Sequence, residues 1–248
     1  MPHADLTPTF IYPDWPAPKN VRALQTTRTG GLSAAPYNSF NLGRHVGDDA
    51  VTVLRNRMLL APYLPSEPVW LIQTHGVQVI DAGLASCDPE GDVCITQQAG
   101  AVCVVMTADC LPVLLCDDHG RVAGAAHAGW RGLCAGVIEA AVASMAVPAT
   151  TVMAWLGPAI GRKSFEVGGE VRDAFMAQDA RAATAFASGT AGKWQADIYK
   201  LARLRLNALG ITRIYGGDFC TYTDPARFFS YRRDGVTGRM GTFIWLEK

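Results

Sequence analysis

The sequence predicts an α/β protein with a mixed β-sheet, folded as a single domain over residues 1–248. Strand-like and helix-like segments alternate along the chain, and short turns join several neighbouring strands, as in antiparallel hairpins. Neither a G-x-G-x-x-G fingerprint nor a P-loop follows a strand, so nothing indicates a doubly wound parallel sheet. No linker, repeat or low-complexity stretch divides the chain, whose length suits one large domain.

Apolar runs bounded by turn residues predict the strands of the first half of the chain. The Pro-rich N-terminus is expected to lie on the body as a strand-like arm. A turn at His75-Gly76 separates two short strands, and the turn residues 117–120 predict a hairpin. The expected strands are residues 69–72, 77–80, 101–107, 111–116 and 122–128.

Helical spacing and capping residues predict the helices of the second half. Pro148 marks the end of the first helix, Asp197 caps the last, and Gly210 stands where a helix C-terminus favours glycine. The expected helices are residues 130–145, 167–178 and 198–209. The expected strands are residues 152–156, 211–215, 228–232 and 240–246.

The composition describes an ordinary globular protein and excludes several classes. Apolar residues make up 49% and charged residues 18%. Lys and Arg balance Asp and Glu, 22 against 22, with no basic run, so we expect no nucleic-acid partner. The N-terminus lacks a secretory signal and no apolar run could span a membrane, so we expect a cytoplasmic monomer or small homo-oligomer without a membrane partner. Seven cysteines without a C-x-x-C pair fit reduced thiols there.

Cys110 and His127 form the first candidate functional pair. If the hairpin turn is centred between Asp118 and His119, Cys110 lies directly opposite His127, and the Cβ atoms of such pairs are about 4.5–5.5 Å apart. The two could then share a metal ion or act as nucleophile and base. Two glycines after His127 allow close backbone approach, and the helix start there favours an anion. The alternative is a core cysteine and a satisfied histidine, and Pro112 warns of a bulge that would shift the register.

His75 would complete a set of two histidines and one cysteine. Three protein ligands with one open position are typical of catalytic zinc, whereas structural zinc has four. Such a set also holds copper, with Met106 as the nearby axial candidate, but five histidines are too few for a multicopper oxidase. Zinc is therefore the expected cofactor, and copper is the alternative, with polyphenol oxidation at most a side activity. Without a metal, His75 is an exposed turn histidine.

Several long motifs carry a resemblance to a known family over nearly the whole chain. With them the chain resembles the bacterial YfiH/YlmD family of purine nucleoside phosphorylases, formerly called polyphenol oxidoreductases or laccase-domain proteins. The motifs are TTRTGGLSAAPYNSFNLGRHVGDD (26–49), QTHGVQVI (73–80), MTADCLPVLLCD (106–117), AAHAGWRGLCAGV (125–137), WLGPAIGRKSFEVGGEV (155–171) and FFSYRRDGVTGRM (228–240).

The resemblance implies a fold, a metal site and activities. The fold is a layered α/β structure with mixed sheets flanked by helices, related to a bacterial toxin deamidase. The family's zinc ligands fall on His75, Cys110 and His127, with no departure at these positions. The implied activities are phosphorolysis of adenosine, inosine and methylthioadenosine to the free base and (methylthio)ribose 1-phosphate, and deamination of adenosine. Some members are named peptidoglycan editing factors.

The expected partners are therefore a small-molecule nucleoside and phosphate. For deamination, zinc would activate water, and Asp109 is the candidate proton shuttle; its alternative role is to hold its own loop by accepting N–H bonds. Arg44, Arg57 and Arg131 are the candidate phosphate or ribose contacts, because guanidinium binds oxyanions in bidentate fashion. Each of them could equally be a surface or structural arginine.

Two other functions stay open at this point. In a thiol hydrolase or amidase acting on a peptidoglycan precursor, Cys110 would be the nucleophile and His127 its base. The chain could also be a metal-binding protein without catalytic activity. Metal removal and a nucleoside-turnover assay distinguish these alternatives from the zinc enzyme.

Overall fold

The computed structural model describes residues 7–85 and 87–248, and its largest sheet has six strands. These are β3 (Val79–Asp81), β4 (Val93–Thr96), β6 (Leu111–Asp117), β7 (Ala123–Ala128), β8 (Val152–Leu156) and β12 (Ile214–Gly216). Their order is β12-β8-β6-β7-β4-β3. The two outer pairs are parallel and the inner pairs antiparallel, so the predicted mixed sheet is confirmed.

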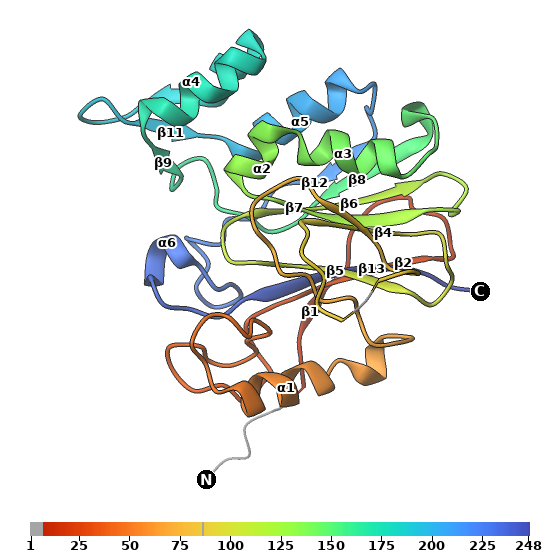
Figure 1. The fold of residues 1–248 in the computed structure, drawn as a ribbon. Helices are drawn as coiled ribbons and strands as arrows, with labels where there is room; N and C mark the ends of the chain where they lie inside the picture. Colours follow the sequence, from red (N-terminus) through yellow and green to blue (C-terminus); the bar gives the residue numbers. More distant parts are fainter. Residues whose placement is uncertain (1–6, 86) are drawn as a thin grey trace.

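A second, antiparallel sheet stacks on one face of the first (Figure 1). It contains β1 (Phe10–Ile11), β2 (Val21–Thr26), β5 (Val102–Thr107) and β13 (Met240–Leu246), in the order β1-β2-β13-β5. Leu114 and Trp155 of the first sheet pack against Val105 and Ile244 of the second in a shared core. Strands β9 (Glu166–Val167), β10 (Phe186–Ser188) and β11 (Trp194–Ala196) form a small separate sheet.

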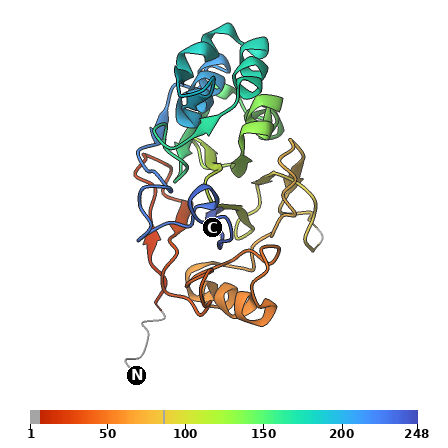
Figure 2. The same ribbon diagram turned by 90° about the vertical axis from the view of Figure 1, so that its left-hand side faces the viewer.

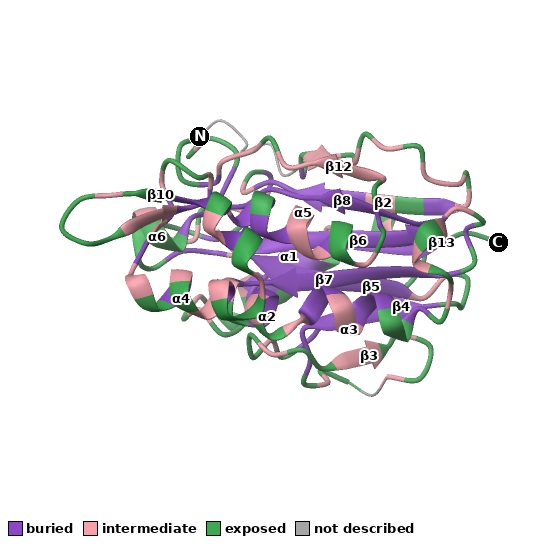
Figure 3. Ribbon diagram, turned by 90° about the horizontal axis from the view of Figure 1, so that it is seen from above, coloured by how far each residue is buried: buried purple, intermediate pink, exposed green. Residues whose placement is uncertain are grey.

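Helices cover the outer faces of the two stacked sheets (Figures 1 and 2). On the six-stranded sheet, Leu133, Ile138 and Leu201 of the helices pack against Val113 and Leu115. The central strands are accordingly buried while the helices expose their outward faces (Figure 3). The helices on this side are α2 (Trp130–Ala135), α3 (Val137–Ser144), α4 (Gly169–Gln178) and α5 (Ile198–Ala208). Helix α1 (Ala50–Met58) lies beyond the four-stranded sheet, so the layered fold is confirmed.

Several predicted elements need correction. The helix expected over residues 130–145 is broken at Gly136, whose φ of 101° ends α2 in the left-handed conformation before α3 begins. The strand expected over residues 228–232 is instead a loop that leads into α6 (Tyr231–Asp234), because Ser230 caps a helical turn by accepting from the Arg233 N–H at 3.2 Å. Residues 69–72 make only isolated bridges.

The strands expected over residues 152–156 and 240–246 are present with the predicted bounds, and the remaining predicted elements are present with shifted ends. The structure also has three short 3₁₀ helices. They are η1 (Ala61–Tyr63), η2 (Ala149–Thr151) and η3 (Ala180–Ala185). Of the expected N-terminal arm, β1 pairs with β2, while residues 1–6 lie outside the described part. None of the helices in the described ranges has the length and apolarity that crossing a membrane requires.

The register predicted for the hairpin β6–β7 is wrong. Pro112, not Cys110, lies opposite His127. The Asp117 side chain accepts hydrogen bonds from the backbone N–H groups of Arg121 (2.6 Å) and Val122 (3.1 Å) and thereby closes the turn further along the chain than expected. The turn centre moves by one residue, and Cys110 falls just before β6.

Candidate metal centre

His75, Cys110 and His127 nevertheless meet at one end of the six-stranded sheet. Their ligand atoms all lie within 4.8 Å of one another, and His75 Nε2 is 3.8 Å from Cys110 Sγ. The two imidazole rings meet edge to face, with centroids 4.7 Å apart. Within residues 7–85 and 87–248, no other histidine, cysteine or carboxylate group of three gathers in this way. The structure therefore brings the three predicted ligands together.

The buried carboxylate of Asp92 organises two of the three ligands. Its Oδ1 accepts from His127 Nδ1 at 2.7 Å and from the backbone N–H of His75 at 3.0 Å. Its Oδ2 accepts from the N–H groups of Gly76 (2.7 Å) and Thr74 (3.1 Å). Burial raises the pKa of Asp92, but these hydrogen bonds, that from His127 foremost, outweigh burial and lower it to about 2. Because Nδ1 of His127 is occupied by the carboxylate, Nε2 is left to face the cluster.

The turn that carries His75 is fixed at both ends. The Gln73 side chain donates to the Met106 carbonyl at 2.9 Å and accepts from the Met106 N–H at 2.7 Å. His75 itself has a φ of 62°, a left-handed conformation that costs energy in a residue other than glycine. The hydrogen bonds from Gln73 and to Asp92 hold the turn in this conformation.

Close packing at the cluster requires glycine at the start of α2. A Cβ on Gly129 would lie 2.8 Å from His75 Cδ2 and 3.1 Å from Cys110 Sγ. A Cβ on Gly132 would lie 2.8 Å from the Gly76 carbonyl. The expected close backbone approach after His127 is confirmed.

Cys110 is placed by the strained residue before it. Asp109 has a φ of 96°, and both of its carboxylate oxygens accept hydrogen bonds, from Thr221 Oγ1 (2.6 Å) and from the Arg232 N–H (2.7 Å). This geometry favours the role of holding the loop, and the proton-shuttle role of Asp109 stays a prediction.

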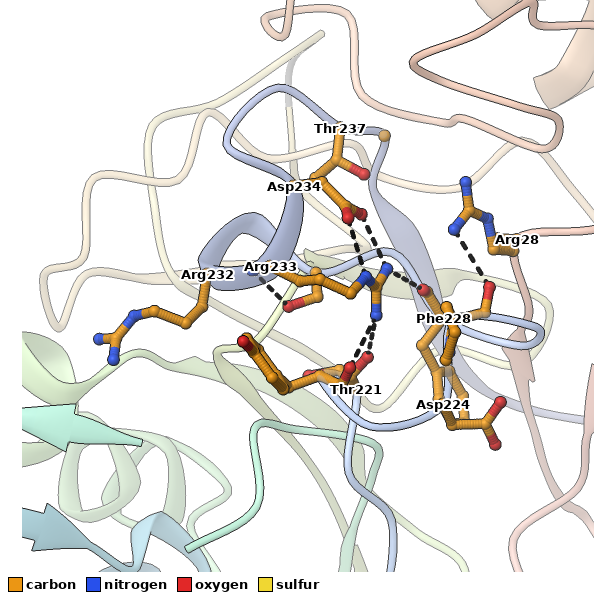
Figure 4. A network of polar contacts seen from close by, with 12 residues as sticks. Arg28, Thr221, Asp224, Phe228, Arg232, Arg233, Asp234 and Thr237 are labelled. Carbon is orange, nitrogen blue, oxygen red and sulfur yellow. Dashed lines mark hydrogen bonds and ion pairs between the residues drawn. The ribbon is translucent and has the colours of Figure 1, made fainter. Parts of the chain in front are cut away.

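The partners of Asp109 are themselves anchored by Arg233 (Figure 4). Its guanidinium donates to the carbonyls of Thr221 (2.7 Å) and Phe228 (3.0 Å) and pairs with Asp234 at 2.7 Å. The Arg232 side chain points away from this network. Arg233 therefore holds the segment before β13 in place, and through it the loop that carries Cys110.

The cluster favours a thiolate beside an imidazolium when no metal is bound. Burial raises the pKa of Cys110, but the charge and hydrogen bond of His127, with a smaller contribution from His75, lower it to about 6. Burial lowers the pKa of His127, but the Cys110 thiolate and Asp92 raise it to about 9. A thiolate is the form of cysteine that binds a metal.

The donor set fits a metal ion such as zinc. Zinc binds thiolate and imidazole in tetrahedral geometry, and a third donor leaves one position open. The carboxylate behind His127 is the partner that metal-bound histidines usually have. As for copper, the Met106 sulfur lies 3.9 Å from Arg57 Nη2, so it is turned toward that guanidinium. The thiolate and the two imidazoles thus match the ligands that zinc prefers.

Two hollows open on the cluster and share Ala108, Cys110 and Tyr231. The first, here called the cationic hollow, measures about 350 Å³ and is also lined by residues that bear no carboxylate: His45, Gln73, His75, Met106, Thr107, His127 and Arg239. The second, here called the aromatic hollow, measures about 250 Å³ and is also lined by Asp109, Trp130, Arg131, Ile160, Phe165, Ile198 and Arg232.

The three predicted substrate arginines are not brought together. Arg131 lines the aromatic hollow, its guanidinium 4.6 Å from the Trp130 ring centroid. Arg44 and Arg57 line another hollow that shares no residue with these two. Arg57 is buried, donates from Nε (3.0 Å) and Nη2 (2.9 Å) to the Leu42 carbonyl and lies 3.6 Å from the Trp70 ring centroid, which is a structural setting.

Sequence reasoning missed Asp92, His45, Tyr231 and Arg239. For Asp92 a signal was present, because a carboxylate at the edge of the apolar run 93–95 must find partners when it is buried. The other three stand in the motifs 26–49 and 228–240, but nothing local in these motifs places them beside the cluster. They lie in loops or in the short helix α6 and reach the cluster only through the tertiary fold.

Comparison with known proteins places this site in a family. The family model described as "Multi-copper polyphenol oxidoreductase laccase" matches residues 22–247. The purine nucleoside phosphorylase YfiH of Escherichia coli is 54% identical over 240 residues, which cover 96% of this chain and 98% of that protein. The chain belongs to the YfiH family. A YfiH-family relative in Pseudomonas aeruginosa, also named a purine nucleoside phosphorylase, is 53% identical over 96% of this chain and 98% of its own length.

Solved structures of YfiH-family proteins have the same fold. A Neisseria meningitidis protein matches with a TM-score of 0.93 at 48% identity, over 96% of this chain and 99% of that one. YlmD of Geobacillus stearothermophilus matches with a TM-score of 0.84 at 30% identity, over 93% of each chain. The layered mixed α/β fold that the resemblance implied is therefore the fold of this family.

Proposed function

We propose that this YfiH-family chain is a zinc-dependent purine nucleoside phosphorylase. The observation that carries the proposal is the cluster of His75, Cys110 and His127, open toward two hollows of different chemistry. The names of its relatives in Escherichia coli and Pseudomonas aeruginosa support the same reaction class. The proposed substrates are inosine, adenosine and methylthioadenosine, and the proposed products are the free base and (methylthio)ribose 1-phosphate.

The reaction needs a nucleophile and a leaving group on opposite sides of the sugar. A phosphate oxygen bonds to C1′ as the bond from C1′ to the purine nitrogen breaks. The proton that hydrogen phosphate loses balances the proton that the departing base takes up. When bound, zinc supplies a Lewis acid at the junction of the two hollows. The chain's own part is to bind both reactants and to hold them in line.

The aromatic hollow suits the purine. Trp130, Phe165 and Tyr231 offer ring faces on which a base can stack, and Ile160 adds apolar surface. Arg232 also lines this hollow, 5.7 Å from the Phe165 ring centroid. Its Nη1 donates to the Glu166 carbonyl at 2.8 Å, and its remaining N–H groups can donate to the base or the ribose. A hollow of this kind also accepts the methylthio group of methylthioadenosine, because the group is apolar.

Adenosine deamination is a second activity that the same cluster supports. Three protein ligands with an open position are the arrangement used to activate water for hydrolysis. Water would replace the amine at the purine ring and release ammonia. Asp109 is the nearest carboxylate in sequence, and the proposal gives it a proton-transfer role only if Asp109→Asn lowers deamination while phosphorolysis and zinc content persist.

The proposal is tested with purified protein and inosine. Phosphate should be required, and hypoxanthine and ribose 1-phosphate should appear in equal amounts. Elemental analysis should find one zinc per chain, lost in His127→Ala and retained in His119→Ala, whose exposed histidine lies in the hairpin turn. Base release at the same rate without phosphate, with free ribose as product, would contradict the proposal. One copper per chain instead of zinc would overturn the metal assignment.

A thiol hydrolase acting on a peptidoglycan precursor is the competing function, because the pKa of Cys110 is lowered beside an imidazolium. Cys110→Asp separates the two, since an anionic oxygen still binds zinc but cannot replace a thiol nucleophile. The zinc enzyme should recover part of the metal binding that Cys110→Ser loses. A covalent adduct on Cys110 in mass spectra during turnover, with activity unaffected by chelation, would establish the thiol mechanism instead.

A further inference from the structure

The cationic hollow has a feature that the metal cluster does not explain, namely an arginine without a carboxylate partner. Arg239 Nη1 donates to the carbonyls of Thr237 and Gly238, both at 3.0 Å. Its stem packs against Gly43, where a Cβ would lie 2.8 Å from Arg239 Cγ. Among the described residues, Arg239 forms no ion pair, and Nε and Nη2 meet no acceptor. The side chain is thus fixed at one edge of its guanidinium and free to donate at the other.

The surroundings of Arg239 hold charges of both signs. Burial lowers the pKa of Arg239, while the nearby Cys110 and Asp109 raise it. Burial first, then the charges of Arg239 and Arg57, lower the pKa of His45, which lines the same hollow. At neutral pH its imidazole is therefore a neutral hydrogen-bond donor beside a fixed positive charge. In the described part of the chain no carboxylate meets the free edge of this half-buried guanidinium, so a bound anion would supply the acceptor that the edge lacks.

Thr107 adds an independent observation. It lies at the end of β5 in the wall of the cationic hollow, and it is 1% exposed. Its hydroxyl has no hydrogen-bond partner among the described residues. A buried hydroxyl without a partner costs the desolvation of the group, so a partner that the protein does not supply, such as a bound anion, would stabilise it.

We infer that the cationic hollow is a binding subsite for inorganic phosphate, held by Arg239 and His45 with Thr107 in its wall. The inference rests on the proposed phosphorolysis and assigns its second substrate to named residues. A guanidinium edge presents two parallel N–H donors, which match two oxygens of a tetrahedral oxyanion. The aromatic hollow adjoins the cationic hollow at the shared residues Ala108, Cys110 and Tyr231. All three candidate ligands line the cationic hollow, so phosphate would lie beside the metal and the base would lie across Cys110 from it.

The inference is tested by the KM for phosphate at saturating inosine. Arg239→Gln should raise this KM about 10- to 100-fold, the effect of losing a charged hydrogen-bond pair, and leave zinc content unchanged. Arg239→Lys keeps the charge but loses the two-donor edge and should raise it less. Arg22→Gln is the control, because it removes an equally charged arginine that is half-exposed and paired with Glu247 at 2.9 Å.

A second variant, Thr107→Val, tests the subsite even if Arg239→Gln fails to fold. Thr107→Val removes a hydroxyl without a partner, so the unliganded fold should be as stable as before or slightly more stable. The KM for phosphate should still rise several-fold. Calorimetric titration of inorganic phosphate into the zinc-loaded wild type and into Arg239→Gln gives the same comparison without turnover.

The outcomes separate the subsite from the reaction. Phosphate-dependent turnover with an unchanged phosphate KM in Arg239→Gln and Thr107→Val would overturn the inference and leave the phosphorylase intact. A large increase in the phosphate KM in Arg44→Gln, with none in Arg239→Gln, would move the subsite to the hollow lined by Arg44 and Arg57. That result would also overturn the inference. Phosphate binding that depends on Arg239, in a protein that releases base without phosphate, would support the subsite and refute the reaction.

Discussion

Replacing Asp92 with asparagine should weaken both the fold and the metal site. Asp92 accepts five hydrogen bonds, and each of its oxygens receives at least two. In either orientation the amide presents its NH₂ group to donors, so at least two buried or part-buried donors lose their acceptor. At about 1–3 kcal/mol each, two lost acceptors lower the free energy of unfolding by about 2–6 kcal/mol. Loss of the carboxylate behind His127 should weaken zinc binding about 10- to 100-fold.

The assay pairs urea unfolding of the metal-free protein with zinc titration against a competing chelator. Asp117→Asn is the matched control, because Asp117 is equally buried and accepts from the N–H groups of Arg121 and Val122, as well as from Arg121 Nε at 2.8 Å, in the hairpin turn. It should lose stability without losing zinc affinity. Equal zinc affinity in Asp92→Asn and Asp117→Asn would refute the assignment of Asp92 as the organising residue.

Three further predictions concern neighbouring features. Gly129→Ala should abolish zinc retention in elemental analysis while circular dichroism stays unchanged, because its Cβ would collide with His75 and Cys110. Arg57→Lys should lower the free energy of unfolding in urea by about 1–3 kcal/mol, because Arg57 donates to the Leu42 carbonyl. It should leave the KM for phosphate unchanged, and a raised KM would restore Arg57 as a substrate contact. In acid titration, the metal-free fold should lose about 2 kcal/mol as pH falls from about 4 to 2, because the folded pKa of Asp92 lies below its unfolded value; Asp92→Asn should lack this loss.

The fold class was predictable because its evidence is local. Hairpin turns, apolar runs and capping residues lie within a few positions of the elements that they define, and Asp197 does cap α5 by accepting from the Lys200 N–H at 2.9 Å. The register of β6–β7 was not predictable from apolar pattern. It depends on which backbone groups the Asp117 carboxylate accepts, and a difference of one turn residue moves every pairing.

The candidate metal ligands and the proposed substrate hollows also differ in how far the sequence predicts them. His75, Cys110 and His127 stand in recognisable motifs, and the prediction that they meet survives a wrong register because the loop at Asp109 brings Cys110 back beside Gly129. Arg239 reaches the cluster only through the pairing of β13 with β5, which no local signal specifies. Residues whose position depends on long-range strand pairing are the ones that the sequence left unassigned.

The anchoring of Asp109 has a consequence for how the protein matures. Its two hydrogen-bond partners, Thr221 and Arg232, lie 112 and 123 residues further along the chain. Until Thr221 and Arg232 have left the ribosome, the carboxylate of Asp109 lacks these two donors, and the loop that carries Cys110 is not held in place. The aligned set of two histidines and one thiolate would therefore form only after residues 221–232 have been synthesised and have folded against Asp109.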